Sequence, residues 1–291
     1  MGVLPRRRLK GGRSLKRPLA AWPALLAYLL LIVSGFLFLL PFLWMVSTSL
    51  KPNTQLFVYP PVWIPEPLVW SNYLKAMTTV PFFVYLQNTL IVACCATLGA
   101  VLSCPLAGYS FARLQWRGRD TLFVITLAVL MVPSQVTMVS LFIVFSKLNL
   151  VGTFYPLILP AFFGAPFFIF LMRQFFKQLP KSLEDAARID GCSEIGIYTR
   201  VMLPLCQPAI LTIALFQFMH SWNDFVGPLI YLSDETLYTL QLGLQQFKQA
   251  YHTEWSQLMA ASVMVAVPII VFYFFVQRSF IQGITFGGIK G

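Results

Sequence analysis

The chain has 291 residues, of which 58% are hydrophobic and 11% are charged. Soluble globular domains carry about 25% charged residues, so this composition excludes an ordinary soluble domain and indicates a membrane protein. The formal net charge of +11 would suit a nucleic-acid-binding protein, but the positions of the basic residues explain it differently, as described below.

Six long stretches contain no Asp, Glu, Lys or Arg. Each exceeds the roughly 20 residues that a helix needs to cross the hydrocarbon layer. The stretches are 18–50, 76–112, 121–146, 148–172, 201–223 and 255–277. Within them we predict spans at 22–46, 84–110, 121–145, 154–176, 207–231 and 257–278. The sequence therefore predicts an all-α membrane protein with six transmembrane helices.

The N-terminal part is predicted to be a basic cytoplasmic tail, 1–21, followed by the first span and its outer loop, 22–79. The first apolar stretch is too long for the hydrophobic region of a signal peptide, which has about 7–15 residues, so we expect it to be retained. Four prolines in 52–65 predict an extended loop there. The transmembrane core is predicted at 80–279, and a glycine-rich cytoplasmic tail at 280–291.

Many of the predicted spans contain proline, which removes a backbone hydrogen bond and predicts kinks. Such kinks fit either ordinary packing or a bundle that moves around a pathway. The prolines are Pro41, Pro105, Pro133, Pro156, Pro160, Pro166, Pro208, Pro228 and Pro268.

The longest inner connection, 181–206, gathers a cluster of acidic residues around a short predicted helix. Ser182 is placed to cap it, and Glu184 and Asp185 would lie in its first turn, where the helix dipole favours negative charge. Ala186 and Ala187 favour a helix, and Gly191 is expected to end it. The acidic first turn disfavours a helix resting on anionic lipid and favours a protein partner.

A second short helix is predicted after the Gly191 corner, capped by Ser193 and closed by Pro204. Four apolar residues at helical spacing predict one buried face. They are Ile195, Tyr198, Val201 and Met202.

Polar side chains within the spans are candidates for a substrate path. Asp224 is an ionisable group near membrane depth, and its neighbours Trp222 and Asn223 offer the aromatic and hydrogen-bonding surfaces that suit a sugar. The intramembrane amides Asn88 and Gln135 could also line a path. The alternative for all of these residues is helix packing, since amides join membrane helices by hydrogen bonds.

The basic residues fix the predicted orientation. With the N-terminus inside, 17 of the 21 Lys and Arg residues fall in inner segments. We therefore predict a multi-pass membrane protein with both termini cytoplasmic. This bias, with anionic membrane lipid as the partner, accounts for the net charge, so no nucleic acid is expected. The five Cys and two His residues show no metal-binding spacing, and no metal site is expected.

The inner connection resembles the EAA loop of ABC importer permeases. Asp185-Ala186-Ala187, Gly191 and Leu203-Pro204 match its pattern, with Asp185 where the family has Glu. "NTL" at 88–90, "WNDF" at 222–225 and the terminal "GITFGGIKG" resemble the carbohydrate-uptake branch, which includes maltose permease subunits. The resemblance runs from about residue 25 to the C-terminus.

This resemblance implies a type-1 ABC importer permease bundle with a cytoplasmic coupling helix, in an importer of the bacterial inner membrane that takes up sugar. It implies a second homologous permease subunit, two cytoplasmic ATPase subunits and an extracytoplasmic solute-binding protein as partners. The chain has no phosphate-binding G-x-x-x-x-G-K-[ST] loop, so no cofactor is expected on this chain, and ATP and Mg belong to the ATPase subunits. The ATPase-coupling residues would be Glu184, Asp185, Ala186, Ala187, Asp190 and Gly191, with Gly287, Gly288 and Lys290 of the tail as further contacts.

Three alternatives stay open at this point. The cargo could be another small polar solute such as glycerol 3-phosphate, although the spans show no clear cation for its phosphate. An ion-coupled secondary transporter would need carboxylates or His in its spans, and these are scarce. An intramembrane enzyme would need a nucleophile with its base or a metal site, and we find neither spacing, so no catalytic residue is predicted.

Overall fold

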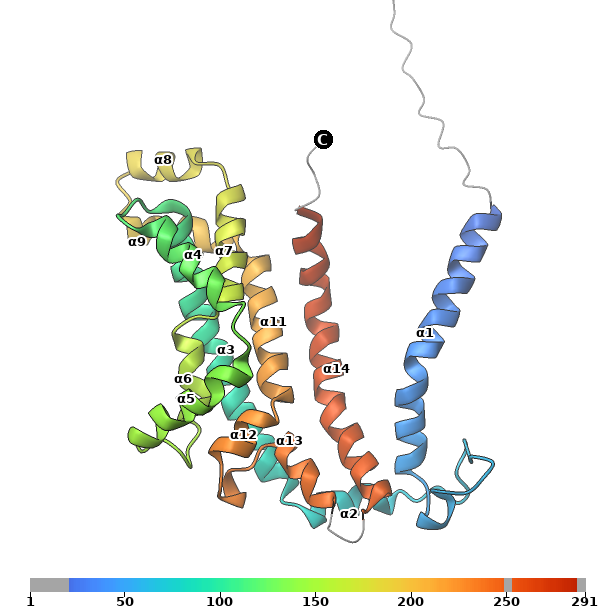
Figure 1. The fold of residues 1–291 in the computed structure, drawn as a ribbon. Coiled ribbons are helices and arrows are strands. Elements are labelled where there is room, and N and C mark those ends of the chain that lie inside the picture. The colour runs from blue at the N-terminus through green and yellow to red at the C-terminus, as the bar shows by residue number, and fades with distance from the viewer. Residues whose placement is uncertain (1–20, 249–252, 287–291) are drawn as a thin grey trace, which may run out of the picture. The chain divides into compact units, whose positions relative to one another are not determined.

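The computed structural model describes residues 21–248 and 253–286, and every regular element within these ranges is helical (Figure 1). The all-α prediction is thus confirmed for the described residues. The long helices are α1 (Ala21–Ser49), α3 (Phe82–Arg113), α11 (Gln207–Asn223) and α14 (Trp255–Phe286). The shorter α-helices between them are α2 (Ser71–Thr79), α4 (Arg119–Val129), α5 (Ser134–Lys147), α6 (Tyr155–Phe162), α7 (Pro166–Gln178), α8 (Ser182–Ile189), α9 (Glu194–Gly196), α10 (Leu203–Leu205), α12 (Val226–Tyr231) and α13 (Leu240–Gly243). Tighter or wider turns form η1 (Asn53–Gln55), η2 (Ile197–Met202), η3 (Glu235–Leu237) and η4 (Leu244–Phe247).

Four helical segments are long and apolar enough to cross a membrane. They are Leu25–Ser49, Phe82–Arg113, Tyr155–Gln178 and Trp255–Phe275. Two bent pairs raise the count to six if each pair is a single span: α4 with α5, bent by 102°, and Glu194–Leu205 with α11, bent by 77°. The described chain thus has four to six candidate spans, and the count of six stays a prediction.

The chain divides into two units, Met1–Met45 and Val46–Gly291. In the first, the described part is the apolar helix α1, whose side chains from Leu25 to Val33 are exposed. The second unit is built around α3, which packs along α7, α11 and α6. Gly108 permits the close approach of α3 to α7, because a Cβ there would lie 2.5 Å from Cβ of Met172.

Two buried clusters lie at opposite ends of α3. The first surrounds its C-terminal half and includes Tyr109, Met172, Phe176, Ala187, Ile197, Met202 and Cys206. The second surrounds its N-terminal end and includes Phe82, Tyr85, Trp222, Leu240, Phe247, Leu258 and Val265. Residues more than 100 positions apart in the sequence thus meet at each end of one helix, which fixes the positions of the loops at both ends.

The predicted outer loop, 47–81, is more ordered than its prolines suggest. Its second half forms α2, and Asn72 on this helix donates hydrogen bonds to the carbonyls of Ser49 and Lys51, at 2.9 and 3.0 Å. Ser256, at the start of α14, donates to the same Lys51 carbonyl at 2.9 Å. Asn72 and Ser256 thus join the end of α1, α2 and α14.

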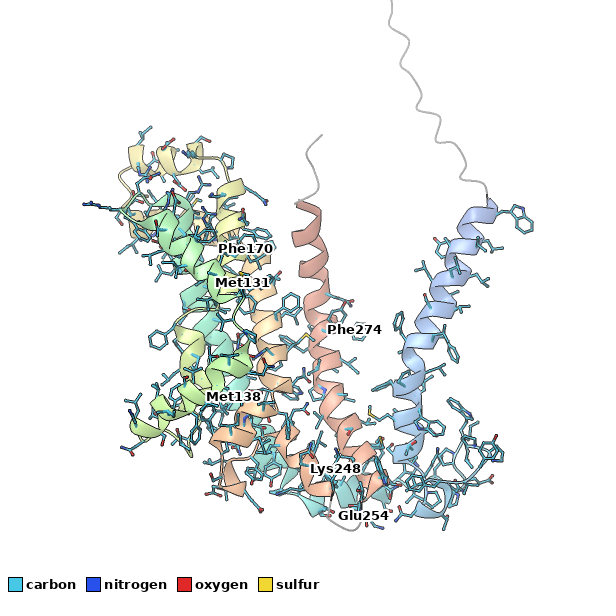
Figure 2. All side chains as sticks on the ribbon, viewed as in Figure 1. Met131, Met138, Phe170, Lys248, Glu254 and Phe274 are labelled. Atoms are coloured by element: carbon cyan, nitrogen blue, oxygen red, sulfur yellow. The ribbon has the colours of Figure 1, made fainter. Side chains whose placement is uncertain are left out.

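Three predicted spans are interrupted rather than continuous, and the one predicted at 154–176 breaks between α6 and α7. The span predicted at 121–145 breaks between α4 and α5, where Pro133 is the N-cap residue of α5. The span predicted at 207–231 breaks at Asp224, between α11 and α12. Met131 lies within the first break, where it is 85% exposed, and Met138 lies in the first half of α5 (Figure 2). Pro105 and Pro268, in contrast, lie inside helices that continue past them.

Candidate functional site: the inner connection and a polar pocket

The helix α8 forms where the sequence predicted it, but not by the predicted cap. Its N-cap residue is Lys181, and Ser182 is already helical and makes no capping hydrogen bond. The capping box predicted at Ser182 is therefore wrong. Glu184 and Asp185 do lie in the first turn, where their charges complement the helix dipole.

Gly191 ends α8 as predicted, with a φ of +79° that glycine adopts without strain. The amide of Gly191 donates to the carbonyl of Arg188 at 3.0 Å, and the amide of Cys192 donates to the carbonyl of Ala187 at 2.9 Å. This pair of bonds is the Schellman arrangement, which satisfies carbonyls at a helix end. The corner therefore has a defined geometry, so α8 has a fixed direction relative to the following helix.

The second helix begins at Glu194, where Ser193 caps it as predicted by accepting a hydrogen bond from the Gly196 amide at 3.2 Å. Three of the four residues predicted for its buried face lie in or against the first cluster: Met202 is fully buried, and Tyr198 and Val201 are partly buried. The prediction is wrong for Ile195, which is 76% exposed, whereas Ile197 is fully buried beside Met202. The turn Ile197–Met202 is π-helical, and its five-residue spacing brings these two side chains to the same face.

The two faces of α8 differ sharply in exposure. Glu184 and Ala187 are its only buried residues, with Glu184 5% exposed. Asp185, Ala186 and Asp190 are exposed, and the side chain of Asp185 is 66% exposed. The predicted partner-contact residue Glu184 thus points into the protein, because it pairs there with a buried arginine, while its neighbour Asp185 points outward.

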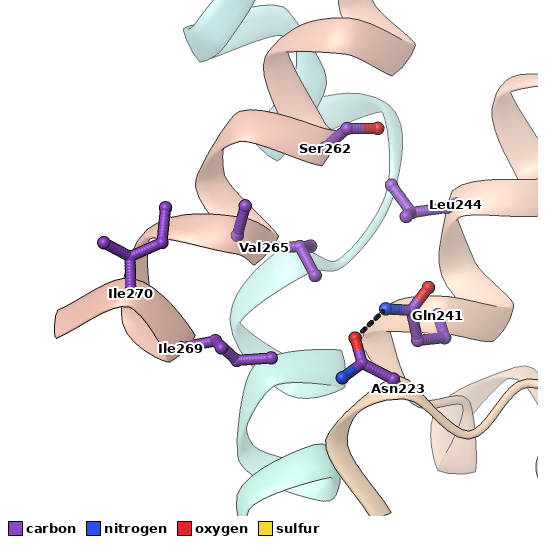
Figure 3. Close-up of a pocket in the computed structure, with 8 residues that line it drawn as sticks. Asn223, Gln241, Leu244, Ser262, Val265, Ile269 and Ile270 are labelled. Carbon is purple, nitrogen blue, oxygen red and sulfur yellow. Dashed lines mark hydrogen bonds between the residues drawn. The ribbon is translucent and has the colours of Figure 1, made fainter. Parts of the chain in front are cut away.

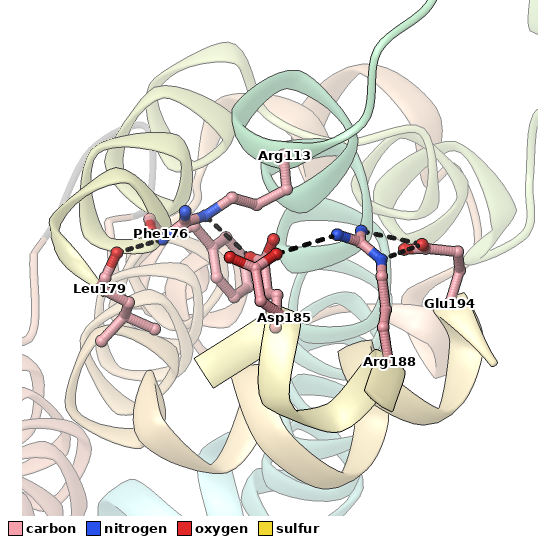
Figure 4. Close-up of polar contacts among 7 residues, drawn as sticks. Arg113, Phe176, Leu179, Asp185, Arg188 and Glu194 are labelled. Carbon is pink, nitrogen blue, oxygen red and sulfur yellow. Dashed lines mark hydrogen bonds and ion pairs between the residues drawn. The ribbon is translucent and has the colours of Figure 1, made fainter. Parts of the chain in front are cut away.

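The buried arginine is Arg113, the last residue of α3. Its Nε lies 3.1 Å from Oε1 of Glu184, with 5% and 6% of the two side chains exposed. The contact is an ion pair rather than a well-directed hydrogen bond, since neither atom makes one. Nη2 of the same guanidinium donates to the carbonyls of Phe176 and Leu179, at the end of α7 (Figure 4). One side chain thus contacts both α7 and α8.

A second group of charged residues lies on the exposed surface of the segment 181–206. Arg188 contacts Glu194 at 2.8 Å and Asp185 at 3.6 Å (Figure 4). The hydrogen bond that Arg188 donates to Glu194 raises the pKa of the Arg188 guanidinium. These ion pairs make the exposed surface polar, and the pair with Glu194 joins the two helices on either side of the Gly191 corner.

A pocket of about 390 Å³ opens where α11, α13, η4 and α14 meet (Figure 3). Its polar lining residues are Asn223, Gln241 and Ser262, and Gln241 donates to Oδ1 of Asn223 at 3.4 Å. Its apolar lining residues are Leu244, Val265, Ala266, Ile269 and Ile270. Of the predicted path residues, Asn223 is the one that lines this pocket.

The other predicted path residues make contacts within the protein. Trp222 is 1% exposed, stacks on Phe218 and donates to the carbonyl of Val265 at 3.3 Å. In this conformation its ring has no free face for a sugar. Asp224 accepts a hydrogen bond from the Gly227 amide at 3.1 Å, which caps the first turn of α12.

The two amides predicted for the path lie in different surroundings. Asn88 is buried and donates to the carbonyls of Thr236 and Tyr238, at 2.9 and 3.0 Å. These hydrogen bonds connect α3 to the segment that follows α12. Gln135 is exposed in the first turn of α5. The tail residues Gly287, Gly288 and Lys290 lie outside the described residues.

Three residues of these sites were not predicted. Arg113 was counted only as an inner positive charge, although a lone arginine ending a long apolar stretch could have suggested a helix-end contact. Gln241 and Ser262 carried no sequence signal for the pocket. Within 21–248 and 253–286 we find no group of three His, Cys, Asp or Glu side chains that could hold a metal ion.

Comparison with known proteins gives consistent matches. The family described as "Binding-protein-dependent transport system inner membrane component" matches residues 99–285. The arabinooligosaccharides transport system permease protein AraQ of Halalkalibacterium halodurans is 34% identical over 277 residues, which cover 94% of this chain and 98% of AraQ. The trehalose/maltose transport system permease protein MalG of Thermococcus litoralis is 33% identical over 271 residues, with coverage of 89% and 94%.

Among solved structures, a similar fold occurs in the crystal structure of a bacterial ABC transporter involved in the import of the acidic polysaccharide alginate. The TM-score is 0.77, and the match covers 89% of this chain and 96% of that chain. The sequence identity is 23%, so this likeness concerns the fold.

Proposed function

This chain belongs to the family of binding-protein-dependent transport system inner membrane components, and we propose that its segment 181–206 couples it to a cytoplasmic ATPase. The protein is a permease subunit of an ABC importer for carbohydrate, a translocation component and not a catalytic one. Relatives that cover nearly its whole length are named for the transport of arabinooligosaccharides and of trehalose and maltose.

The exposed face of α8 is the observation that carries the coupling role. Six of its eight residues are exposed, and Asp185 projects from its first turn. The Schellman corner at Gly191 and the cap at Ser193 hold this helix in a defined direction. A short helix that is held rigidly and exposes most of its side chains suits insertion into a groove of another protein. The small side chain of Ala186 allows close approach.

The complete importer would then contain this chain, a second homologous permease, two ATPase subunits that hold ATP and Mg, and an extracytoplasmic solute-binding protein. The chain would cross the membrane six times with both termini cytoplasmic. The tail residues Gly287, Gly288 and Lys290 would add contacts to the ATPase.

The polar pocket favours a neutral cargo. Its lining contains amides, a hydroxyl and aliphatic side chains, and none of its eight lining residues is charged. Amides donate and accept hydrogen bonds as sugar hydroxyls require, whereas glycerol 3-phosphate would be expected to recruit a cation. Asn223 would contribute to the sugar path from this subunit, and the second permease would supply the remainder.

Co-purification tests the coupling role directly. Asp185→Lys reverses an exposed charge on α8, so it should reduce the amount of ATPase that purifies with the permease while leaving the permease folded. Glu235→Lys makes the same change at an exposed site in η3 and should have no effect. Wild-type recovery of ATPase with Asp185→Lys would contradict the assignment.

A further inference from the structure

The buried pair of Arg113 and Glu184 links three elements that the proposed transport cycle must move together. We propose that this pair is the joint through which displacement of α8 by the ATPase is transmitted to the cytoplasmic ends of α3 and α7. The proposal rests on the coupling role assigned to α8 above, and it assigns to Arg113 a positioning role that the sequence did not suggest.

The first argument is how few side chains of α8 are buried against the membrane-spanning helices. Only two of its side chains are buried, Glu184 and Ala187. Ala187 contributes one methyl group to the cluster around Phe176 and Met202. A single methyl contact can slide, whereas an ion pair with fixed partners resists displacement. Glu184 is therefore the residue that can carry a directed force from α8.

The second argument is where the force would go. Arg113 ends α3, so its backbone moves with that helix. Its Nη2 is bonded to the carbonyls of Phe176 and Leu179, so its side chain is also bound to the end of α7. A planar guanidinium can make these contacts and the Glu184 contact at once because its donors point in several directions. Pulling on Glu184 therefore pulls on two helices.

The third argument is that the chain itself offers slack. Between α7 and α8 the backbone runs through Leu179, Pro180 and Lys181, outside both helices. Small rotations in this connection would let α8, with the segment that the Gly191 corner holds to it, move relative to α7. The Arg113–Glu184 pair bridges α8 to the ends of α3 and α7. A displacement of α8 is therefore transmitted to these helices and is not taken up by the flexible connection.

Hydrogen exchange on the complete complex in lipid nanodiscs tests the joint. The complex contains both permeases and the ATPase, and the probe is ATP with vanadate. Three segments are followed: 182–190, which contains α8; 110–116, which contains the end of α3; and 174–180, which contains the end of α7. In the wild type, we expect nucleotide to change the exchange rates of all three segments several-fold.

Glu184→Gln removes the charge with little change of shape. We expect the nucleotide response to persist in 182–190 but to fall to baseline in 110–116 and 174–180. Arg113→Lys keeps a cation, but its donors lie on one nitrogen and cannot replace both Nε, which faces Glu184, and Nη2, which binds the two carbonyls, so the same split is expected. The matched control is Asp120→Asn, which removes the acid of an exposed ion pair with Arg119; it should respond like the wild type.

The outcomes separate the joint from the coupling role. If all three segments of the variants still respond to nucleotide, the pair does not transmit the displacement of α8, and the coupling role stays intact. This holds even if the variants exchange faster than the wild type before nucleotide is added. Loss of the response in 182–190 as well would also overturn the joint, since the pair would then only hold α8 in place. If α8 of the wild type shows no protection when the ATPase is added, the coupling role itself fails.

Discussion

Adjacent acidic residues on α8 have opposite environments, and this sets the cost of changing each. Removal of one partner from a buried ion pair leaves an uncompensated charge and costs about 3–5 kcal/mol. We therefore expect Glu184→Gln to lower the free energy of unfolding by an amount of this order, as measured by denaturant titration in detergent micelles. Asp185→Asn, at an exposed side chain, should leave it unchanged. Equal stability of the two variants would show that the Arg113 contact does not contribute to folding.

Asn88 is a second residue whose role depends on its contacts. Its amide donates to two backbone carbonyls, and in Asn88→Asp a carboxylate would face both of them without a donor. We expect a loss of about 1–3 kcal/mol in the free energy of unfolding. Gln135→Glu, at an exposed amide in the first turn of α5, is the control and should be neutral for stability. An unchanged unfolding midpoint for Asn88→Asp would favour the path role over the structural one.

At this scale the sequence predicts backbone-determined features better than side-chain contacts. Gly191 and Ser193 were predicted correctly because a left-handed residue and an N-cap are local requirements. Ser182 was as good a cap by composition, but the helix begins one residue earlier than a Ser182 cap requires. The burial of Glu184 could not be predicted, because its partner lies 71 positions away on α3, as the ion pair shows.

Among the elements, α3 depends on small residues where other helices approach. At Gly108 an added Cβ would meet Cβ of Met172 at 2.5 Å and the backbone amide of Arg173 at 3.1 Å. Backbone cannot move aside cheaply, so Gly108→Ala should force α3 and α7 apart at a cost of about 1–3 kcal/mol. Thermal unfolding of the purified protein would show this as a lower midpoint.

Gly35 provides the matched control for this change. It lies in α1, and an added Cβ there meets no atom within 4 Å. Gly35→Ala should be neutral or slightly stabilising, since alanine favours a helix over glycine by roughly 0.5–1 kcal/mol. A Gly108→Ala variant as stable as Gly35→Ala would mean that the close approach of α3 and α7 is not required.

The interrupted helices show where sequence reasoning about elements reaches its limit. The apolar stretches predicted where helices occur because hydrophobicity over 20 residues is a property of composition. The break at Asp224 was hidden because a carboxylate in an apolar stretch suggests function as readily as a cap. The π-helical turn at Ile197–Met202 was likewise hidden, since its five-residue period appears only once the neighbouring cluster is packed.

For the whole molecule, the distribution of charge and of exposed apolar surface agrees with a membrane environment. Large apolar side chains are exposed along α1, along α4 and α5, and at 267–275 in α14. Water would make such surfaces costly, whereas lipid or a second permease would cover them. The positive charge is confined largely to the predicted inner segments, where anionic lipid attracts it.

The bent pair α4–α5 decides the topology, because a 102° bend fits either a broken span or a re-entrant loop. A span would place the segment 148–153 outside, whereas a re-entrant loop would leave it inside. The overall charge bias favours the span, because 17 of the 21 Lys and Arg residues then lie in inner segments, although Lys147 itself would lie outside. Alkaline phosphatase, which is active only outside the cytoplasm, should therefore be active when fused after Val151 and inactive when fused after Arg117. Inactivity at both sites would reduce the number of crossings to five and place the two termini on opposite sides of the membrane.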